Sequence, residues 1–495
     1  MTQATLESAA FIVSPTQVAL DTALLPYDIW GTRAHVLMLA ATGIIPPAAA
    51  VAICGALAEI EADTAGGTFA IDPTRGAQLS LEQAVIERVG VGDGSRMHTA
   101  RSRNDQVLVT ELLHLREQGL TLAQAGAAAV AALLDLAAAH GATVMPGYTH
   151  MQPAKPTSFG QWALAYADAL TRSLADLQYT WAQYDTCPLG AVESYGTSWP
   201  IDRALSARLL GFARVWEVPQ DAIGARGLPQ LAYLDVCKRL ALTISKIAAD
   251  LLLFTTWEYS YVNLGSAIAQ RLHPITGSSV MAQKKNPDAL ELLRATGHEV
   301  IGLAGTAAHL LAGLPMGYNR DTREIKEWSA LGFAKTLAAL GILRTTLATL
   351  EVDAPRMRAA VEANYSSTTD LADAIAAQTG VGYRQIYGVV GRLVDSLIAA
   401  GQPLGSLRAA TICTAAAQAG LAIQLADSAV QAALDPAQAL AARTHLGGAA
   451  PAEMTRMLVA RQQHLAAYHA WIAARWEQIQ TARTATQQAM QALQG

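Results

Sequence analysis

The chain has 495 residues, of which 52% are hydrophobic and 15% are charged, and its formal net charge is −5 at pH 7. A chain of this length can bury a large core and is expected to form more than one domain. The small negative charge and the lack of a basic run in the sequence argue against nucleic-acid binding. No N-terminal stretch has the pattern of a secretory signal, so we expect a cytoplasmic protein.

The composition favours helices and argues against cysteine-based sites. The sequence is rich in alanine and only 6% aromatic, which is typical of closely packed helices rather than β-sandwiches. The alanine-rich run from Gly119 to Leu134 carries no charge, but it is too short and too weakly apolar for a membrane span. We therefore expect a buried helix there and no membrane partner. The cysteines have no paired spacing, which indicates neither a disulfide framework nor a metal site: Cys54, Cys187, Cys237 and Cys413.

Three helical domains are expected in chain order. Residues 1–102 show short helical patterns interrupted by Pro46-Pro47, Gly66-Gly67 and Gly92-Asp93-Gly94. Residues 354–495 predict a third helical domain, which ends in an alanine- and glutamine-rich helical tail. Between them, residues 103–353 contain long helical patterns at about 104–139, 157–185, 229–262, 286–312 and 322–351. The predicted fold class is all-α, with a central long-helix bundle.

The length of the central helices predicts self-association. Helices of about thirty residues span about 45 Å at 1.5 Å per residue, which suits a bundle shared between subunits better than a compact monomer. Packing within one chain is the simpler alternative. The pattern from Pro229 to Tyr261 is apolar on more than one face, through Leu231, Leu234, Leu240, Ile244, Ile247, Leu251 and Phe254.

The most informative segment is residues 277–287, Gly-Ser-Ser-Val-Met-Ala-Gln-Lys-Lys-Asn-Pro. Gly277 permits backbone angles that would let Ser278 approach a ligand, and Lys284 and Asn286 can bind carboxylate oxygens. The alternative is a solvated loop in which Ser279 caps the next helix. The helical pattern that follows anchors the loop on a rigid element, which favours a reactive site beside a bound carboxylate.

This loop resembles that of the fumarase/aspartase superfamily, and further segments resemble its argininosuccinate lyase branch. These are Tyr27-Asp28-Ile29-Trp30-Gly31-Thr32-Arg33-Ala34-His35, Met97-His98-Thr99-Ala100-Arg101-Ser102-Arg103-Asn104-Asp105-Gln106 and Gly147-Tyr148-Thr149-His150-Met151-Gln152-Pro153-Ala154-Lys155-Pro156. A later turn at 443–451 is also similar, so the resemblance covers nearly the whole chain. It implies a homotetramer with a 20-helix core, and active sites shared between subunits.

The resemblance also implies a reversible carbon–nitrogen lyase that eliminates fumarate from an N-substituted aspartate without a metal or organic cofactor. Such a reaction needs a base, fixed donors for the dianion that forms, and an acid for the leaving nitrogen. Ser278 is the predicted base, and its alkoxide would need support from Lys284 and backbone donors. His150 is predicted to protonate the leaving nitrogen, although a lone histidine is more often structural.

The resemblance places substrate-binding roles on residues from all parts of the chain. Hydroxyl, amide and cationic side chains suit carboxylate binding. The predicted set is Thr32 (a serine in the branch), Arg103, Asn104, Thr149, Arg226, Ser279, Asn286, Tyr318, Arg323 and Lys326.

Several positions depart from the branch pattern. Arg323 replaces a glutamine, Arg75-Gly76-Ala77-Gln78 replaces Glu-Asp-x-His, and Arg226-Gly227 replaces an Arg-Asp pair. Ala282 replaces a loop proline, which bears on loop stiffness rather than on charge. Acids that could hold a guanidinium are lost, and Arg323 could bind an extra substrate carboxylate. A salt bridge from Arg323 to Glu327 on the same helix is the alternative.

The predicted substrate is therefore an aminopolycarboxylate, such as ethylenediamine-disuccinate or iminodisuccinate. Argininosuccinate is the alternative substrate, because the overall resemblance is to that branch. A catalytically silent structural homologue is the alternative of another class, which the presence of Ser278, Lys284, Asn286 and His150 disfavours.

Overall fold

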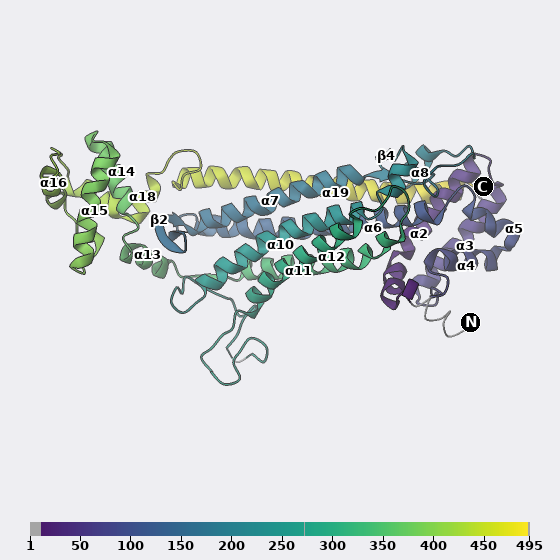
Figure 1. Cartoon of the computed structure of the whole chain (residues 1–495), viewed down its shortest axis with the longest axis horizontal. Coiled ribbons are helices and arrows are strands. Elements are labelled where there is room, and N and C mark those ends of the chain that lie inside the picture. Colours follow the sequence, from purple (N-terminus) through teal and green to yellow (C-terminus); the bar gives the residue numbers. More distant parts are fainter. Residues whose placement is uncertain (1–10, 272, 494–495) are drawn as a thin grey trace.

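The computed structural model describes residues 11–271 and 273–493, and it confirms the all-α fold class. The molecule is elongated (Figure 1), with helices of the N-terminal region at one end, long helices in the middle and a group of short helices at the other end. The described residues form helices α2 to α19, and about 69% of the chain is helical.

The N-terminal region consists of α2 (Pro15–Ala41), α3 (Pro47–Ala65), α4 (Ala77–Val89), α5 (Val91–Gly94) and the 3-10 turn η1 (Ser95–His98). Helix α2 begins at a serine cap, where the Ser14 hydroxyl accepts a hydrogen bond from the Gln17 backbone N–H. Nearly every residue of α2 from Asp28 to Ala40 is buried, because the helix lies between α3 and the central bundle. This burial fixes the position of α2 beside the candidate site described below.

The central bundle contains α6 (Arg103–His140), α7 (Phe159–Tyr184), α10 (Leu228–Phe254), α11 (Asp288–Leu311) and α12 (Ile325–Ala348). These are the five long helices predicted from the apolar periodicity, with most ends shifted by a few residues. Their shared core contains leucine, isoleucine and many alanine side chains, which allow close approach of the helices. Two segments, Arg103–His140 and Arg320–Ala348, are long and apolar enough for a membrane span, but about half of each is buried against other helices.

The predicted end of α10 near residue 262 is wrong, because the helix ends at Phe254. The Thr255 and Thr256 hydroxyls donate to the carbonyls of Leu252 and Leu253, and these bonds compete with continued helix. Ser260 then adopts a left-handed conformation with φ of 48°. The chain therefore turns before the short strand β5.

The strands are short and pair in twos. An antiparallel hairpin, β1 (Val144–Thr149) and β2 (Gln152–Ser158), joins α6 to α7 and was not predicted from the sequence. The other pairs are β3 (Thr186–Cys187) with β4 (Arg214–Val215), and β5 (Val262–Asn263) with β6 (Glu351–Val352). The connection between α7 and α10 also contains α8 (Arg203–Leu209) and α9 (Pro219–Gly224), and the turn η2 (Arg320–Arg323) precedes α12.

The last part of the chain has two distinct pieces. A module of short helices lies at the far end of the bundle: α13 (Ala354–Ala363), α14 (Thr368–Thr379), α15 (Tyr383–Ala399), η3 (Leu404–Ser406), α16 (Ala409–Gln418), α17 (Asp427–Leu434) and α18 (Pro436–Ala441). Helix α19 (Pro451–Ala492) then runs back along the bundle (Figure 1) and packs on α6, α2 and α8. In its last turns Thr486 accepts a hydrogen bond of 3.1 Å from the Trp30 indole of α2.

Candidate functional site

A pocket of about 370 Å³ lies where α2, the start of α6 and the turn before α12 meet. Six predicted substrate-binding residues line it: Arg103, Asn104, Arg226, Tyr318, Arg323 and Lys326. The other lining residues are Val13, Asp21, Arg75, Gly76, Ala77, Gln78, Ser102, Val107 and Arg320. The lining thus contains many arginine and lysine side chains and a single carboxylate, that of Asp21, which suits an anionic ligand.

The start of α6 presents Arg103 and Asn104 to the pocket. Ser102 and Asp105 form a capping box, in which the Ser102 hydroxyl accepts from Asn104 N–H at 3.2 Å and Asp105 accepts from Ser102 N–H at 3.0 Å. The helix N-terminus carries a partial positive charge that adds to the charge of Arg103.

The loop that leads into α6 contains a strained residue, Ala100, whose φ is 57°. A left-handed backbone costs an L-residue with a side chain about 1–2 kcal/mol. We expect Ala100→Gly to raise the free energy of unfolding by up to about 1 kcal/mol, after the greater chain entropy of glycine is subtracted. Urea denaturation followed by circular dichroism measures the change. Ala165→Gly on the exposed face of α7 is the control and should lower stability by about 0.5–1 kcal/mol. A loss of stability in both variants would contradict the strain at Ala100.

Arg226 is buried at the pocket wall and stacks on the ring of Tyr318, with 4.8 Å between the guanidinium carbon and the ring centroid. Its Nε is buried and has no hydrogen-bond partner among residues 11–271 and 273–493. The next residue, Gly227, starts α10 with φ of 88°, a left-handed conformation that favours glycine. Gly76 starts α4 in the same way, with φ of 78°. Two positions at which the branch has acids are thus left-handed glycines here.

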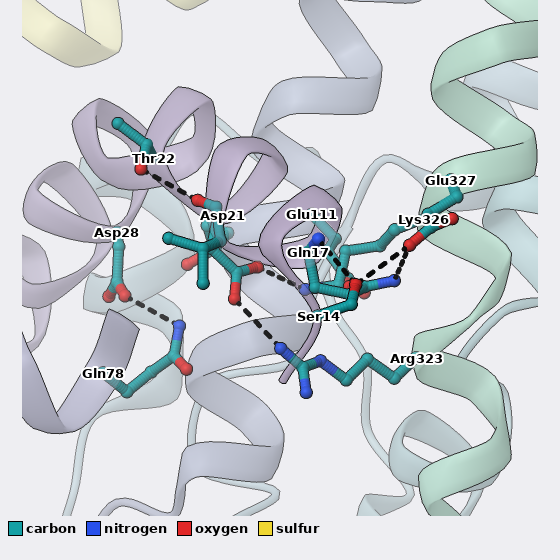
Figure 2. A network of polar contacts seen from close by, with 12 residues as sticks. Ser14, Gln17, Asp21, Thr22, Asp28, Gln78, Glu111, Arg323, Lys326 and Glu327 are labelled. Carbon is teal, nitrogen blue, oxygen red and sulfur yellow. Dashed lines mark hydrogen bonds and ion pairs between the residues drawn. The ribbon is translucent and has the colours of Figure 1, made fainter. Parts of the chain in front are cut away.

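Lys326 and Arg323 are paired with carboxylates inside the protein (Figure 2). The Lys326 Nζ lies 2.6 Å from Asp21 Oδ1 and 3.6 Å from Glu111 Oε1, and Arg323 Nη2 lies 3.5 Å from Asp21 Oδ2. The alternative pairing of Arg323 with Glu327 is wrong. The turn η2 directs Arg323 toward α2 and away from Glu327. Glu327 instead accepts hydrogen bonds from Ser14 and Gln17.

Thr32 lies behind the pocket lining rather than in it. Its side chain is fully buried, where it accepts from Arg101 at 3.0 Å and donates to Asp28 at 3.4 Å. Asp28 also accepts from Gln106 and from the pocket residue Gln78. Burial raises the pKa of Asp28, and the hydrogen bonds oppose that rise. This buried network connects α2 to α4 and α6 behind the pocket lining.

The loop with the predicted base is closed by a bridge between Gly277 and Lys285. The Ser278 hydroxyl oxygen accepts backbone N–H hydrogen bonds from Val280 at 3.3 Å and Met281 at 2.9 Å. Such donors stabilise negative charge on oxygen. Gly277 is required for space rather than for a left-handed backbone, because a Cβ there would lie 2.1 Å from the Arg271 carbonyl oxygen. Ser279 is not the helix cap of the alternative interpretation, since Pro287 precedes the first turn of α11.

Thr149 and His150 are exposed at the tip of the hairpin. His150 and Met151 are both left-handed, with φ of 54° and 59°. Non-glycine residues in this conformation are uncommon and concentrate at functional sites. The hairpin is held from behind by Arg443, which donates to the Pro156 carbonyl at 2.7 Å and pairs with Asp370 of α14.

The pocket lies far from the other two groups of candidate residues within a single chain. Arg103 starts α6 and the hairpin follows its end, so 38 residues of helix, about 57 Å, separate the pocket from His150. Lys284 and Asn286 precede α11, whose 24 residues separate them by about 36 Å from Tyr318 beyond its other end. Figure 1 shows the hairpin and the 264–287 loop far from α2.

Sequence reasoning missed the acids around Lys326. Asp21 and Glu111 are single carboxylates within apolar helical patterns, where no local signal marks them as functional. Arg320 lies between the predicted residues Tyr318 and Arg323 in the sequence, but its contact with the pocket could be found only from the turn η2.

The comparisons with known proteins agree with this geometry. Residues 15–302 match the family model described as lyase, and residues 365–441 match that of the argininosuccinate lyase C-terminal region. The argininosuccinate lyase of Methanoculleus marisnigri is 34% identical over 450 residues, covering 90% of this chain and 88% of the relative. That of Lacticaseibacillus paracasei is 35% identical over 454 residues, covering 91% and 95%.

Solved structures show the same relationship. EDDS lyase in complex with formate superposes with a TM-score of 0.86 at 27% identity, over 96% of this chain and 92% of that chain. A fumarate lyase from Mesorhizobium sp. BNC1 shares the fold, with a TM-score of 0.69 at 20% identity over 91% and 97% of the two chains. The chain therefore belongs to the argininosuccinate lyase branch of the fumarase/aspartase superfamily and is a fumarate-forming carbon–nitrogen lyase.

Proposed function

We propose that the protein eliminates fumarate from an aspartate whose nitrogen substituent carries further carboxylates, an aminopolycarboxylate such as ethylenediamine-disuccinate or iminodisuccinate. One observation carries the proposal: most of the positions that depart from the branch pattern in charge line one pocket. Arg75, Gly76, Gln78 and Arg323 line it, and the departing Gly227 directly follows the lining residue Arg226. The gained arginines and lost acids make that pocket more positive than the branch pattern implies.

The pocket offers cations for several carboxylates. Among the described residues, Arg103 and Arg226 form no ion pair with a protein carboxylate, so their charges are available to a ligand. A guanidinium is best bound by carboxylates in bidentate geometry. The single lining acid, Asp21, already contacts Lys326 and Arg323. This arrangement supports an anionic amine better than arginine.

Argininosuccinate is the second candidate substrate. The relatives with 34–35% identity over most of their length carry the name argininosuccinate lyase, and EDDS lyase is less similar in sequence at 27%. The shared turn around Ser278 serves either substrate, because both contain the same succinyl group.

The proposed mechanism uses one succinyl-binding arrangement contributed by several chains of a homotetramer. Ser278, supported by two backbone N–H groups, removes the proton beside the carboxylate, and Lys284 and Asn286 hold the dianion. His150 of another chain protonates the leaving nitrogen. Thr149 and Ser279 contribute hydroxyl donors to the substrate carboxylates. We expect no metal or organic cofactor and a cytoplasmic location.

Amine addition to fumarate tests the substrate. Purified protein is incubated with fumarate and with ethylenediamine, aspartate or arginine, and the loss of fumarate absorbance is followed. Activity is expected with aspartate, which carries additional carboxylates, whereas ethylenediamine is cationic like arginine and should react less well. Activity with arginine alone would overturn the aminopolycarboxylate proposal in favour of argininosuccinate. Silence with all amines, including in the cleavage direction, would favour a structural homologue without activity.

Arg226→Gln is expected to raise KM for the anionic substrate by about 10- to 100-fold, because the substrate loses one charge-assisted hydrogen bond at a buried position. Steady-state kinetics measures the change. Arg75→Gln is the matched control: Arg75 is exposed and already paired with Asp72, so its loss should change KM by less than about fivefold. Equal effects of the two variants would show that general charge, rather than a contact with Arg226, determines binding.

A further inference from the structure

We infer that Arg323 is a specificity-determining residue that excludes cationic amines, because its guanidinium neutralises Asp21, the one carboxylate lining the pocket. The inference rests on the proposed function and deepens it. It gives Arg323 a different role from binding an extra substrate carboxylate: the residue occupies the place that a substrate cation would otherwise take.

The contacts of Asp21 are made on both carboxylate oxygens. Oδ1 lies 2.6 Å from Lys326 Nζ and Oδ2 lies 3.5 Å from Arg323 Nη2 (Figure 2). The side chains of Asp21 and Arg323 are only 7% and 13% exposed, so water screens this pair weakly. No oxygen of Asp21 is left without a cationic neighbour.

The four charges of this cluster balance. Lys326 lies between Asp21 and a second buried carboxylate, Glu111, at 3.6 Å. Glu111 also accepts a hydrogen bond of 2.9 Å from Gln230. Two carboxylates therefore face two cations, and Arg323 supplies the second cation. Without Arg323, the cluster would carry one uncompensated negative charge at the pocket wall, and a buried charge of that kind strongly favours a cationic ligand.

The guanidinium of Arg323 is also fixed in position. Its Nη1 donates to the backbone carbonyl of Ile12, and Arg320 donates to the same carbonyl at 3.3 Å. A carbonyl holds the guanidinium without cancelling its charge. Arg323 thus stays beside Asp21 at the pocket wall, where its charge repels an incoming ammonium or guanidinium group.

Arg323→Gln tests the inference through the ratio of two substrates. In the addition direction, kcat/KM is measured with fumarate and either aspartate or arginine. The variant is expected to shift the ratio toward arginine by at least about tenfold, since it exposes a carboxylate to the cationic amine. Arg323→Lys keeps the charge and should retain the wild-type ratio.

Arg320→Gln is the matched control. Arg320 lines the same pocket and contacts the same Ile12 carbonyl, but it forms no ion pair with Asp21. The variant loses one positive charge without releasing that carboxylate, so its ratio should shift by less than about threefold. Adding Asp21→Asn to Arg323→Gln should abolish the gain. Calorimetric titration with arginine gives a second readout that does not depend on turnover.

The outcomes separate this inference from the proposed function. Equal shifts in Arg323→Gln and Arg320→Gln, or no gain of arginine binding and turnover in a folded Arg323→Gln protein, would overturn the role of Arg323 alone. A wild-type enzyme that prefers arginine to aspartate would overturn the proposed function itself.

Discussion

Ser278→Ala is expected to lower kcat by about 10²–10⁴-fold, the usual contribution of a positioned general base. The hydroxyl oxygen is the atom on which the backbone N–H groups of Val280 and Met281 converge, at 3.3 and 2.9 Å. Since alanine has no oxygen there, neither proton abstraction nor this stabilisation remains. Single-turnover kinetics with the succinylated amine measures the chemical step.

The neighbouring serine provides the control for this variant. Ser279 is exposed and accepts no comparable pair of hydrogen bonds, so Ser279→Ala should act mainly on KM. Both variants should keep the wild-type helix content and assembly, because the loop contributes little to the core. A folded Ser278→Ala enzyme that retained most of its rate would remove Ser278 as the base.

Mixing Ser278→Ala protein with His150→Asn protein is expected to restore about a quarter of the wild-type activity after subunit exchange, if each site takes these residues from different chains that pair at random. Each parent alone should be nearly inactive. The expectation follows from the proposed mechanism, in which Ser278 and His150 of one site come from different chains.

Subunit exchange must be shown independently, for example with a tagged parent and native mass spectrometry. If exchange occurs and the mixture stays inactive, the proposal of shared sites is wrong. Ser278 and His150 of one site would then belong to the same chain.

The long helices could be predicted because their apolar periodicity is strong and extends over many turns. The end of α10 could not, since side-chain hydroxyls of Thr255 and Thr256 compete for the backbone while the sequence remains apolar. The hairpin at 144–158 was hidden for another reason: Gly147 and several prolines give neither a helical nor an alternating pattern. Tertiary contacts such as that of Arg443 hold it in place.

The candidate site, like the fold, could be predicted from the sequence only in part. Arg103, Arg226 and Lys326, which the resemblance assigned to substrate binding, line one pocket in the structure. It could not place Asp21 opposite Arg323, since the pairing depends on how α2 lies against the turn η2. The replacement of the branch's glutamine by Arg323 was visible in the sequence. Its pairing with Asp21 was not.

Helix α19 joins the two ends of the molecule physically. Its final turns meet α2 through Thr486 and Trp30, and Arg483 stacks on the same indole at 4.4 Å. The C-terminal end of α19 thus packs against α2, the helix that carries Asp21. Shortening the C-terminus would remove contacts that hold α2 in place at the pocket wall. Purification tags and truncations are therefore better placed elsewhere.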